Sequence, residues 1–437
     1  MLAYYLGLAL RSFQRNVALT ALMIVAIAFG VGASMTTLTV LHVLSADPIP
    51  GRSGNLYYVQ LEPRPAAGQV PGVEPPNQLT RADAEALLRA GGADRQALMT
   101  GGDAAIEPQR AGQRPFFVDA RWTSADFFPM FRVPFAAGGA WTAEDDRRAA
   151  RVAVISRALA ERLFGAVDVV GRSVRVKGTE LRIAGVIDAW RPTPHFYDLE
   201  TGAYGPGEQL FVPFSTSREL KLERRGNQDC WTVPSDLRDL EGVGVDSPCW
   251  WIQYWVELGS EARAAEYRER LVRYSEEQRR AGRFGRPPNV RLRTVTEWLE
   301  HRDIVPRDVR LQVWIALGFL IVCLVNTVGL LLTKFLRRSA EIGVRRALGA
   351  PARSIFIQLL VEAGAIGLCG GLLGLGLSWL GLWVVRQQPA AYAELARLDL
   401  AMLAATFALA VAASLLAGLL PAWRGCQVTP AIQLKSH

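Results

Sequence analysis

Four long apolar runs limit what this chain can fold into more than any other feature of its sequence. They cover residues 17–46, 306–336, 355–386 and 400–421. About 20 consecutive apolar residues suffice to carry a helix across the hydrocarbon core of a bilayer. We therefore predict a membrane protein with four transmembrane helices and a large α+β domain, residues 47–305, between the first helix and the second.

The long polar stretch between the first two runs has the pattern of a folded domain. Alternating branched and aromatic residues predict strands, and Ser or Thr before helical patterns predicts helix starts. The strongest strand signals are 55–61, 181–187 and 250–258, and the candidate N-caps are Thr80, Ser156 and Ser260. The order of elements at both edges predicts one α+β lobe made of 47–115 and 250–300, with a second lobe, 116–249, inserted into it.

Positive charge predicts the orientation of the spans. With four spans, the arginines of segment 1–16, Lys334, the arginines of segment 337–354 and Arg424 all fall on one side. Cytoplasmic loops carry the excess of Lys and Arg. We therefore expect both termini in the cytoplasm, with 1–16 as an amphipathic helix on the inner membrane surface and 422–437 as a tail. This explains the net charge of +8 without a nucleic-acid partner.

The connector between the second and third spans, residues 337–354, is short, charged and prone to form a helix. Gly343 and Gly349 are predicted to bracket a turn or two of helix, with the arginines in water. Such a piece has the shape of a lever that another protein pushes on. Glu362 follows near the same end of the third span. An ionisable group in a span is a functional candidate, although Glu362 could equally reach water or a connector arginine.

Small residues spaced four apart predict close helix contacts. Such spacing allows two backbones to approach in a membrane. The pairs are Gly30 with Ser34, Gly367 with Gly371, and Gly370 with Gly374. The sequence Pro421-Ala422-Trp423-Arg424 is predicted to end the fourth span.

The five cysteines fall into two groups. Cys323, Cys369 and Cys426 lie in or beside apolar runs and are interpreted as inert small hydrophobic residues. Cys230 and Cys249 are the two cysteines of the soluble domain. Outside the cytoplasm a disulfide between them is possible, and two buried free thiols are the alternative.

Catalytic motifs are missing from the sequence. It contains no GxxxxGK[ST] phosphate loop, GxSxG or HExxH, and its four histidines form no ligand cluster. The acidic stretch 144–146 is interpreted as a solvated turn. We therefore expect no enzyme activity, no metal and no cofactor bound by this chain. Work across a membrane would then need a partner that supplies the energy.

Several motifs resemble MacB/FtsX-type ABC transporter permeases. The stretch 341–350 (EIGVRRALGA) resembles the connector of these permeases, as do 358–363 (QLLVEA) and 421–424 (PAWR). The domain resembles the periplasmic core domain of the family at the motifs Phe127-Phe128, Gly138-Gly139 with 141–146, 152–156 with 160–165, Gly171, and 185–187.

The resemblance implies a permease in the bacterial inner membrane that works as a dimer, with an identical copy or a sister permease, and with a cytoplasmic ABC ATPase. ATP and Mg²⁺ would be used by that ATPase. Because the chain begins directly with segment 1–16, the ATPase is expected on a separate subunit. The implied coupling residues, which would dock on the ATPase, are Glu341, Ile342, Gly343, Val344, Arg345, Arg346, Ala347, Leu348 and Gly349.

The implied mechanism is mechanotransmission, in which the spans act as levers that move the periplasmic domain. The leading function is export of peptides, antibiotics or similar molecules with a periplasmic adaptor and an outer-membrane channel. Regulation of a cell-wall hydrolase or a sensor kinase is one alternative, and extraction of lipoproteins or lipids from the membrane is another. The size of the domain, by analogy with the family, favours export or extraction.

Overall fold

The computed structural model describes residues 12–13, 16–68, 70, 72–108, 112, 114–233, 239, 241–305, 307–388 and 400–426. The chain divides into two compact units. We call Met1–Ser45 with Val305–His437 the helix unit, and Ala46–Ile304 the sheet unit. Most of the predicted amphipathic helix over 1–16, and the tail beyond Cys426, lie outside the described residues.

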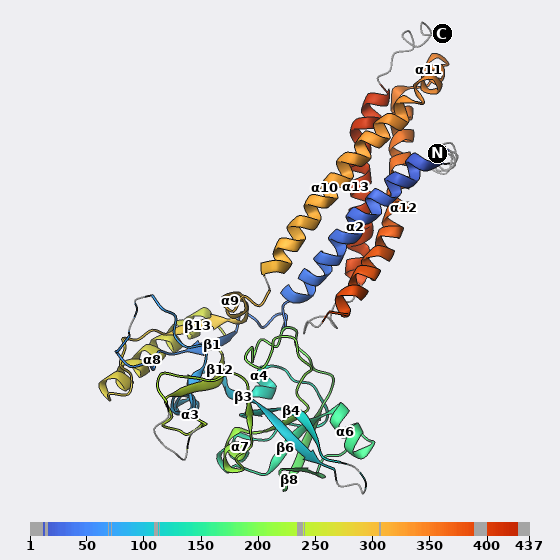
Figure 1. Cartoon of the computed structure of the whole chain (residues 1–437). Coiled ribbons are helices and arrows are strands. Elements are labelled where there is room, and N and C mark those ends of the chain that lie inside the picture. Colours follow the sequence, from blue (N-terminus) through green and yellow to red (C-terminus); the bar gives the residue numbers. More distant parts are fainter. Residues whose placement is uncertain are drawn as a thin grey trace. The chain divides into compact units, whose positions relative to one another are not determined.

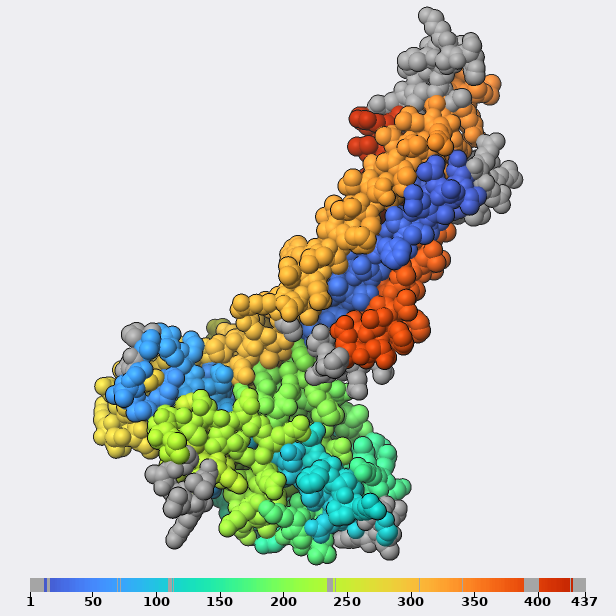
Figure 2. Space-filling view, viewed as in Figure 1, coloured from blue at the N-terminus to red at the C-terminus, as the bar shows by residue number. Residues whose placement is uncertain are grey.

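The helix unit contains four helices that are long and apolar enough to cross a membrane. Its helices are α2 (Val17–Ser45), α10 (Arg307–Leu336), α11 (Ser339–Ala347), α12 (Ala352–Arg386) and α13 (Leu400–Cys426). The four long helices lie side by side, with α2 between α10 and α12 (Figures 1 and 2). Together with the mixed sheet of the other unit, they confirm the predicted fold class.

The candidate span in α13 ends at Arg424, within the motif 421–424 that is predicted to end it, but the helix extends further. The helix does not stop at Pro421 but contains it and continues to Cys426. Ala417 is 3% exposed and Ala422 is fully buried, so this end of the helix packs against its neighbours. Such packing lets a membrane helix tolerate the backbone hydrogen bond that proline removes.

The sheet unit contains a mixed sheet with helices on its faces. Its strands are β1 (Leu56–Gln60), β2 (Leu79–Thr80), β3 (Arg95–Glu107), β4 (Phe116–Thr123), β5 (Phe135–Gly138), β6 (Val152–Ser156), β7 (Ser173–Val176), β8 (Thr179–Ile187), β9 (Leu210–Pro213), β10 (Arg224–Arg225), β11 (Asp229–Cys230), β12 (Cys249–Glu257) and β13 (Arg291–Thr294). Its helices are α3 (Arg81–Ala90), α4 (Phe127–Met130), α5 (Ala143–Arg147), α6 (Arg157–Phe164), α7 (Phe214–Glu219), α8 (Glu261–Arg280) and α9 (Val295–His301).

One sheet runs through both of the lobes that the sequence predicts. The strand order is β13-β1-β12-β3-β4-β9-β6-β8-β5, antiparallel except where β4 pairs with β9 and β6 with β8. The long strand β3 joins the halves, because it pairs with β12 through Arg95–Met99 and with β4 through Met99–Ile106.

Each face of the sheet carries its own hydrophobic core, because successive side chains of a strand point to opposite faces. Val59 belongs to one core, which α3, α6 and α8 cover, and Tyr58 belongs to the other. The second core is rich in aromatic rings: Tyr58 stacks on Trp298 of α9 with ring centroids 3.9 Å apart. Both cores include residues from both predicted lobes, so the sheet unit packs as one body.

Local capping explains where the helices of this unit begin. The hydroxyls of Thr80, Ser156 and Ser260 accept hydrogen bonds from the backbone N–H groups three residues later. Each bond satisfies a donor that the first helical turn leaves without a partner. The three predicted helix starts are therefore confirmed. Helix α9, which begins after the capping box at Thr294, was not predicted from the sequence.

Candidate functional site

The short helix α11 carries the predicted coupling residues, and its position differs in detail from the prediction. Gly343 lies in the middle of α11 and is buried, whereas Gly349 follows the helix with φ +92°. Only Gly349 therefore has the left-handed conformation that favours glycine at the end of a helix. Ile342, which is 7% exposed, shares the inner side of α11 with Gly343.

A buried ionic cluster joins α10 and α12 beside α11. Glu362 of α12 is 1% exposed. Its Oε1 lies 2.8 Å from Lys334 Nζ of α10, and its Oε2 lies 2.9 Å from Arg338 Nη1 in the turn before α11. The Ser12 hydroxyl donates to Glu362 Oε1, and Lys334 also donates to Thr20 Oγ1 of α2 over 3.0 Å. We call Lys334, Arg338 and Glu362 the α11 cluster.

The burial of the α11 cluster makes its pairing obligatory. Lys334 is fully buried and the Arg338 side chain is only 15% exposed. A buried charge without a partner costs several kcal/mol, about 3–5 kcal/mol when one member of a buried pair is removed. Of the two outcomes left open for Glu362, the structure shows contact with a connector arginine rather than with water. The cluster joins α10, the turn before α11, and α12. These three elements are therefore fixed relative to one another at this end of the bundle.

A second layer of contacts holds α11 itself. Arg345 lies 2.8 Å from Glu341 and donates to Gln358 Oε1 of α12 over 3.1 Å. Arg346 donates to the carbonyl oxygen of Cys426 at the end of α13 over 3.0 Å. The prediction that the connector arginines point into water is therefore wrong for Arg338, which is buried against Glu362. Arg345 and Arg346 are partly exposed and also contact acceptors of α12 and α13.

The outer face of α11 has the opposite character. Val344 is 61% exposed, Leu348 is 84% exposed, and Ala347 between them is also exposed. Residues three and four apart lie on the same side of a helix, so these three form one apolar strip. We call it the outer face of α11. Helix α11 thus presents an apolar strip outward while polar contacts tie it and the turn before it to α12 and α13.

The predicted small residues lie at close contacts between the long helices. Ser34 donates to the Ala316 carbonyl of α10 over 3.1 Å, and a Cβ on Gly30 would come within 2.9 Å of Leu320 of α10. A Cβ on Gly370 would lie 2.8 Å from Ile27, and one on Gly374 would lie 3.2 Å from the Ala28 oxygen, so this pair faces α2.

The other glycine pair of α12 faces α13. A Cβ on Gly371 would lie 2.7 Å from Ala410, and one on Gly367 would overlap Ser414. Helix α12 therefore uses one pair of glycines against α2 and the other against α13, which allows close backbone approach on two sides.

Comparison with known proteins identifies both halves of the chain. Residues 20–274 match the model of the MacB-like periplasmic core domain, and residues 313–430 match the FtsX-like permease C-terminal model. The chain belongs to the MacB/FtsX-type family of ABC transporter permeases.

Named relatives of this permease include exporters. The macrolide export ATP-binding/permease protein MacB of Rhodospirillum rubrum is 27% identical over 448 residues, which cover 99% of this chain and 60% of the relative. The pyoverdine export ATP-binding/permease protein PvdT of Pseudomonas aeruginosa is 23% identical, over 72% of this chain and 42% of the relative. The permease chain thus spans about 60% or less of the length of these relatives.

Among solved structures, the periplasmic region of MacB from Actinobacillus actinomycetemcomitans aligns with a TM-score of 0.36 and 12% identity, over 58% of this chain and 95% of that chain.

Four apolar helices and membership of this family make the permease an inner-membrane protein.

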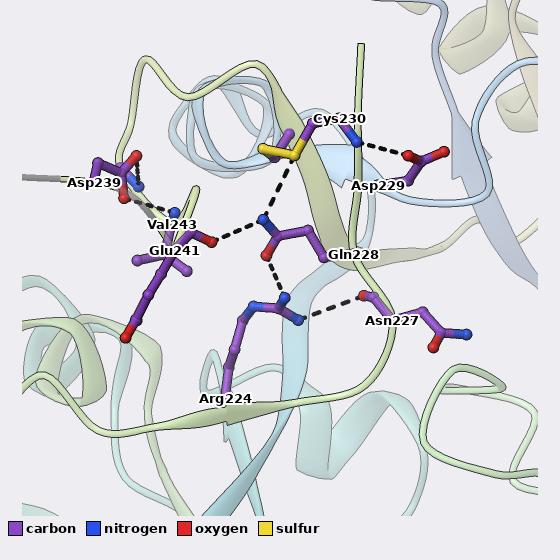
Figure 3. Close-up of a disulfide and its surroundings, with 10 residues drawn as sticks. Arg224, Asn227, Gln228, Asp229, Cys230, Asp239, Glu241 and Val243 are labelled. Atoms are coloured by element: carbon purple, nitrogen blue, oxygen red, sulfur yellow. Dashed lines mark hydrogen bonds between the residues drawn. A yellow bond between two sulfur atoms is a disulfide. The ribbon is translucent and has the colours of Figure 1, made fainter. Parts of the chain in front are cut away.

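In the sheet unit of the permease, Cys230 and Cys249 are joined by a disulfide between the paired strands β11 and β12 (Figure 3). The Gln228 side chain lies beside the bridge, where its Nε2 donates to the Glu241 carbonyl over 2.8 Å and contacts Cys230 Sγ at 3.6 Å. Arg224 donates to Gln228 Oε1. The bridge and Gln228 thus hold the segment around Glu241 against β12.

A second buried ionic cluster lies within the sheet unit. Arg121 of β4 is 1% exposed and pairs with both Asp198 and Glu208, and the Tyr197 hydroxyl donates to Glu208 over 2.7 Å. Burial alone would raise the pKa of Glu208, but the adjacent Arg121 lowers it below its ordinary value. We call Arg121, Asp198 and Glu208 the sheet cluster.

Asp146 contradicts the interpretation of 144–146 as a solvated turn. Its carboxylate accepts hydrogen bonds from the Ala125 backbone N–H (2.7 Å) and from Trp141 Nε1 (2.8 Å). Burial raises the pKa of Asp146 to about 6. The physical reason is that α5 begins with the Thr142–Asp145 capping box, which turns the next carboxylate toward the unit's interior.

The sequence analysis allows for contact of Glu362 with a connector arginine, but it does not predict the pairing of Lys334 with Glu362 or the pairs of Arg121. A lysine and a glutamate inside apolar helices are a signal that such a pair exists, because neither charge is tolerated alone in a membrane. Arg121 sits in a strand of ordinary alternating pattern and gives no comparable signal.

Proposed function

We propose that this chain is the membrane subunit of an ABC exporter, in which α11 receives the motion of an ATPase and passes it to the long helices. The observation that carries the proposal is the two-sided character of α11. Its outer face (Val344, Ala347 and Leu348) is apolar and exposed, whereas Arg338, Arg345 and Arg346 fix its other sides to α12 and α13, and Glu362 of α12 is in turn paired with Lys334 of α10. A load applied to the outer face would therefore move those helices together.

The charge distribution supports a cytoplasmic position for α11. Lys334 and the arginines of α11 lie at one end of the bundle, and positive residues mark the cytoplasmic side of membrane proteins. In this orientation both termini are cytoplasmic and the sheet unit is periplasmic. A disulfide in the sheet unit agrees with that compartment.

The energy would come from an ATPase that these 437 residues do not contain, since the sequence has no phosphate-binding loop. ATP and Mg²⁺ would bind to that ATPase. Relatives named ATP-binding/permease proteins support such a partner. We propose a dimeric permease, formed with an identical copy or a sister chain, that docks two ATPase domains.

The transported molecules are proposed from the relatives. Their printed names describe macrolide export and pyoverdine export. We propose that this permease drives export of peptides, antibiotics or similar molecules by moving its periplasmic sheet unit, together with an adaptor and an outer-membrane channel.

The test is the ATPase activity of the co-purified complex in lipid nanodiscs. Val344→Glu with Leu348→Glu places two charges on the outer face of α11 and leaves the α11 cluster intact. We expect this variant to insert normally but to lose most of the stimulation of the ATPase. Val233→Glu is the matched control, because Val233 is 81% exposed and lies in the sheet unit. Equal stimulation by the α11 variant and the wild type would refute the coupling role.

A further inference from the structure

A groove of about 600 Å³ opens on the sheet unit, and all of its lining residues belong to that unit. Helices α3, α5 and α7 and strand β3 supply its lining. Its volume is in the range of small-molecule sites, about 300–1,000 Å³. Such sites combine an apolar surface with a few polar groups that orient the ligand, and this groove has both.

The apolar part of the groove comes from Leu88, Leu98 and Phe214. Phe214 stacks on the fully buried Trp251 with ring centroids 5.9 Å apart, so its ring has a fixed support. Apolar and aromatic ligand atoms gain free energy by leaving water for such a surface, about 25 cal/mol per Å².

The charged part of the groove has one cation that no carboxylate neutralises. Each of the three lining carboxylates has other partners: Glu85 pairs with Arg81 at 2.7 Å, Glu219 pairs with Arg151 at 3.3 Å, and Asp146 accepts hydrogen bonds from the Ala125 N–H and Trp141 Nε1. Arg218 of α7 has no carboxylate within ion-pairing distance in the part of the chain that the structure describes. It donates to the Leu222 carbonyl over 2.8 Å and to Ser217 Oγ over 3.3 Å, which are uncharged acceptors.

The surroundings of Arg218 favour an added negative charge. Burial, together with the nearby cations Arg81 and Arg224, lowers the pKa of Arg218 to about 10, and the Glu241 carboxylate offsets only part of this. A carboxylate or sulfonate placed in the groove would offset both effects, because charge-assisted hydrogen bonds to guanidinium are the stronger kind.

A second polar group in the lining also lacks a partner. Ser124 is 4% exposed, and its hydroxyl is buried without a hydrogen-bond partner among the described residues. A buried hydroxyl left unsatisfied costs about 1–3 kcal/mol. A ligand acceptor atom in the groove would remove that cost.

We propose that this groove binds an organic anion with an apolar body, whose anionic group contacts Arg218 and Ser124 while its apolar part packs on Phe214 and Leu88. The site is separate from the coupling residues and adds to the proposed function a ligand class that the sheet unit recognises. Cations of the same shape are disfavoured by Arg218, since the other arginines of the lining are paired with Glu85 or Glu144.

The test compares three probes that share one apolar body, 4-phenylbutyrate, 4-phenylbutylamine and 4-phenylbutan-1-ol. Binding to the full chain in lipid nanodiscs is measured by equilibrium dialysis, with empty nanodiscs as the blank. We expect the carboxylate to bind about tenfold or more tightly than the amine, which corresponds to about 1.4 kcal/mol.

Variants locate the site. Arg218→Met keeps the length of the side chain but removes its charge, and should weaken binding of 4-phenylbutyrate about tenfold, whereas Arg218→Lys should retain most of it. Ser124→Val should weaken it by a smaller factor. Arg114→Met, at an exposed arginine outside the groove, is the matched control and should bind normally. Thermal unfolding of each variant verifies that the sheet unit remains folded.

Equal binding of the carboxylate and the amine would overturn the proposal. So would unchanged binding by a folded Arg218→Met variant, or binding no greater than that of empty nanodiscs. The assay contains no ATPase, so any of these failures would leave the coupling role of α11 unaffected.

Discussion

The α11 cluster and the sheet cluster are both buried ionic triads, but they are built in opposite ways. In the sheet cluster one cation, Arg121, sits between two carboxylates. In the α11 cluster one carboxylate, Glu362, sits between two cations. The sheet cluster lies within a unit whose strands are fixed by a continuous ladder, whereas the α11 cluster joins separate helices.

The difference indicates what each cluster does. Removing a charge from the sheet cluster should destabilise one rigid body without changing how its parts move. Removing a charge from the α11 cluster should also release the helices from α11, so coupling should fail together with stability. The α11 end has an exposed apolar strip beside its cluster, and this strip is the interaction site that we propose. The following predictions test this contrast, from the largest expected effect to the smallest.

Arg121→Met should lower the free energy of unfolding of the sheet unit by about 5 kcal/mol, because it leaves two buried carboxylates without their cation. The measurement is denaturant unfolding followed by near-UV circular dichroism. Arg175→Met is the control, since its pair with Glu107 is half exposed and should contribute less than about 1 kcal/mol. A loss below 1 kcal/mol for Arg121→Met would show that the sheet cluster is dispensable.

Glu362→Gln should lower the free energy of unfolding by about 4 kcal/mol. The loss is slightly smaller than for Arg121→Met, because the partly exposed Arg338 side chain can turn toward water. The midpoint temperature of thermal unfolding in detergent and the stimulation of the ATPase should both decrease. Glu362→Asp keeps the charge and should preserve more of both properties. If ATPase stimulation survived in Glu362→Gln while stability fell, the α11 cluster would be a structural feature only.

Replacing Cys230 and Cys249 with Ser should destabilise the sheet unit by about 3 kcal/mol, because the bridge closes a loop with a sequence separation of 19 in the unfolded chain. The double variant is compared with the wild type by denaturant unfolding without reductant. Cys369→Ala, at a free cysteine of α12, should leave the sheet unit unchanged. An unaltered midpoint in the double variant would argue against the bridge.

The last effect in this order is that of Asp146, a pH dependence worth no more than about 3 kcal/mol, and less within the pH range that can be measured. Its pKa of about 6 in the folded state lies above the ordinary value of 3.8, so folding favours the protonated form. Its contribution to stability is therefore greatest below about pH 4 and is lost as the pH rises through 6. Unfolding midpoints of wild type and Asp146→Asn, compared between pH 4 and 7, should differ in slope. Parallel profiles would contradict the raised pKa.

The sequence was sufficient for the fold class and for the main periodic features. Each transmembrane helix follows from a long apolar run, and the starts of α3, α6 and α8 follow from single capping hydroxyls. These features depend on residues that are close in sequence, so they can be predicted from a single amino-acid sequence. The family resemblance, confirmed by the two family models, added the position of the candidate site at α11.

Features that depend on distant contacts could not be predicted. Strand β3 contains Gly101-Gly102-Asp103, a pattern typical of a turn, yet the Trp122 ring of β4 lies where a side chain at Gly102 would be. The pairing of Lys334 with Glu362 depends on how α10 packs near α12, and the helix through Pro421 depends on packing of α13. In each case tertiary contact outweighs the local signal.

The most direct test of the central claim is a photo-crosslink from the outer face of α11 in intact cells. A photoreactive amino acid at position 348 replaces the most exposed residue of the strip, and position 233 in the sheet unit provides the control. We predict that mass spectrometry of the adduct at 348, and not of that at 233, identifies a protein with a GxxxxGK[ST] phosphate loop. An adduct at 348 without any ATPase, or the same ATPase at both positions, would contradict the coupling role of α11.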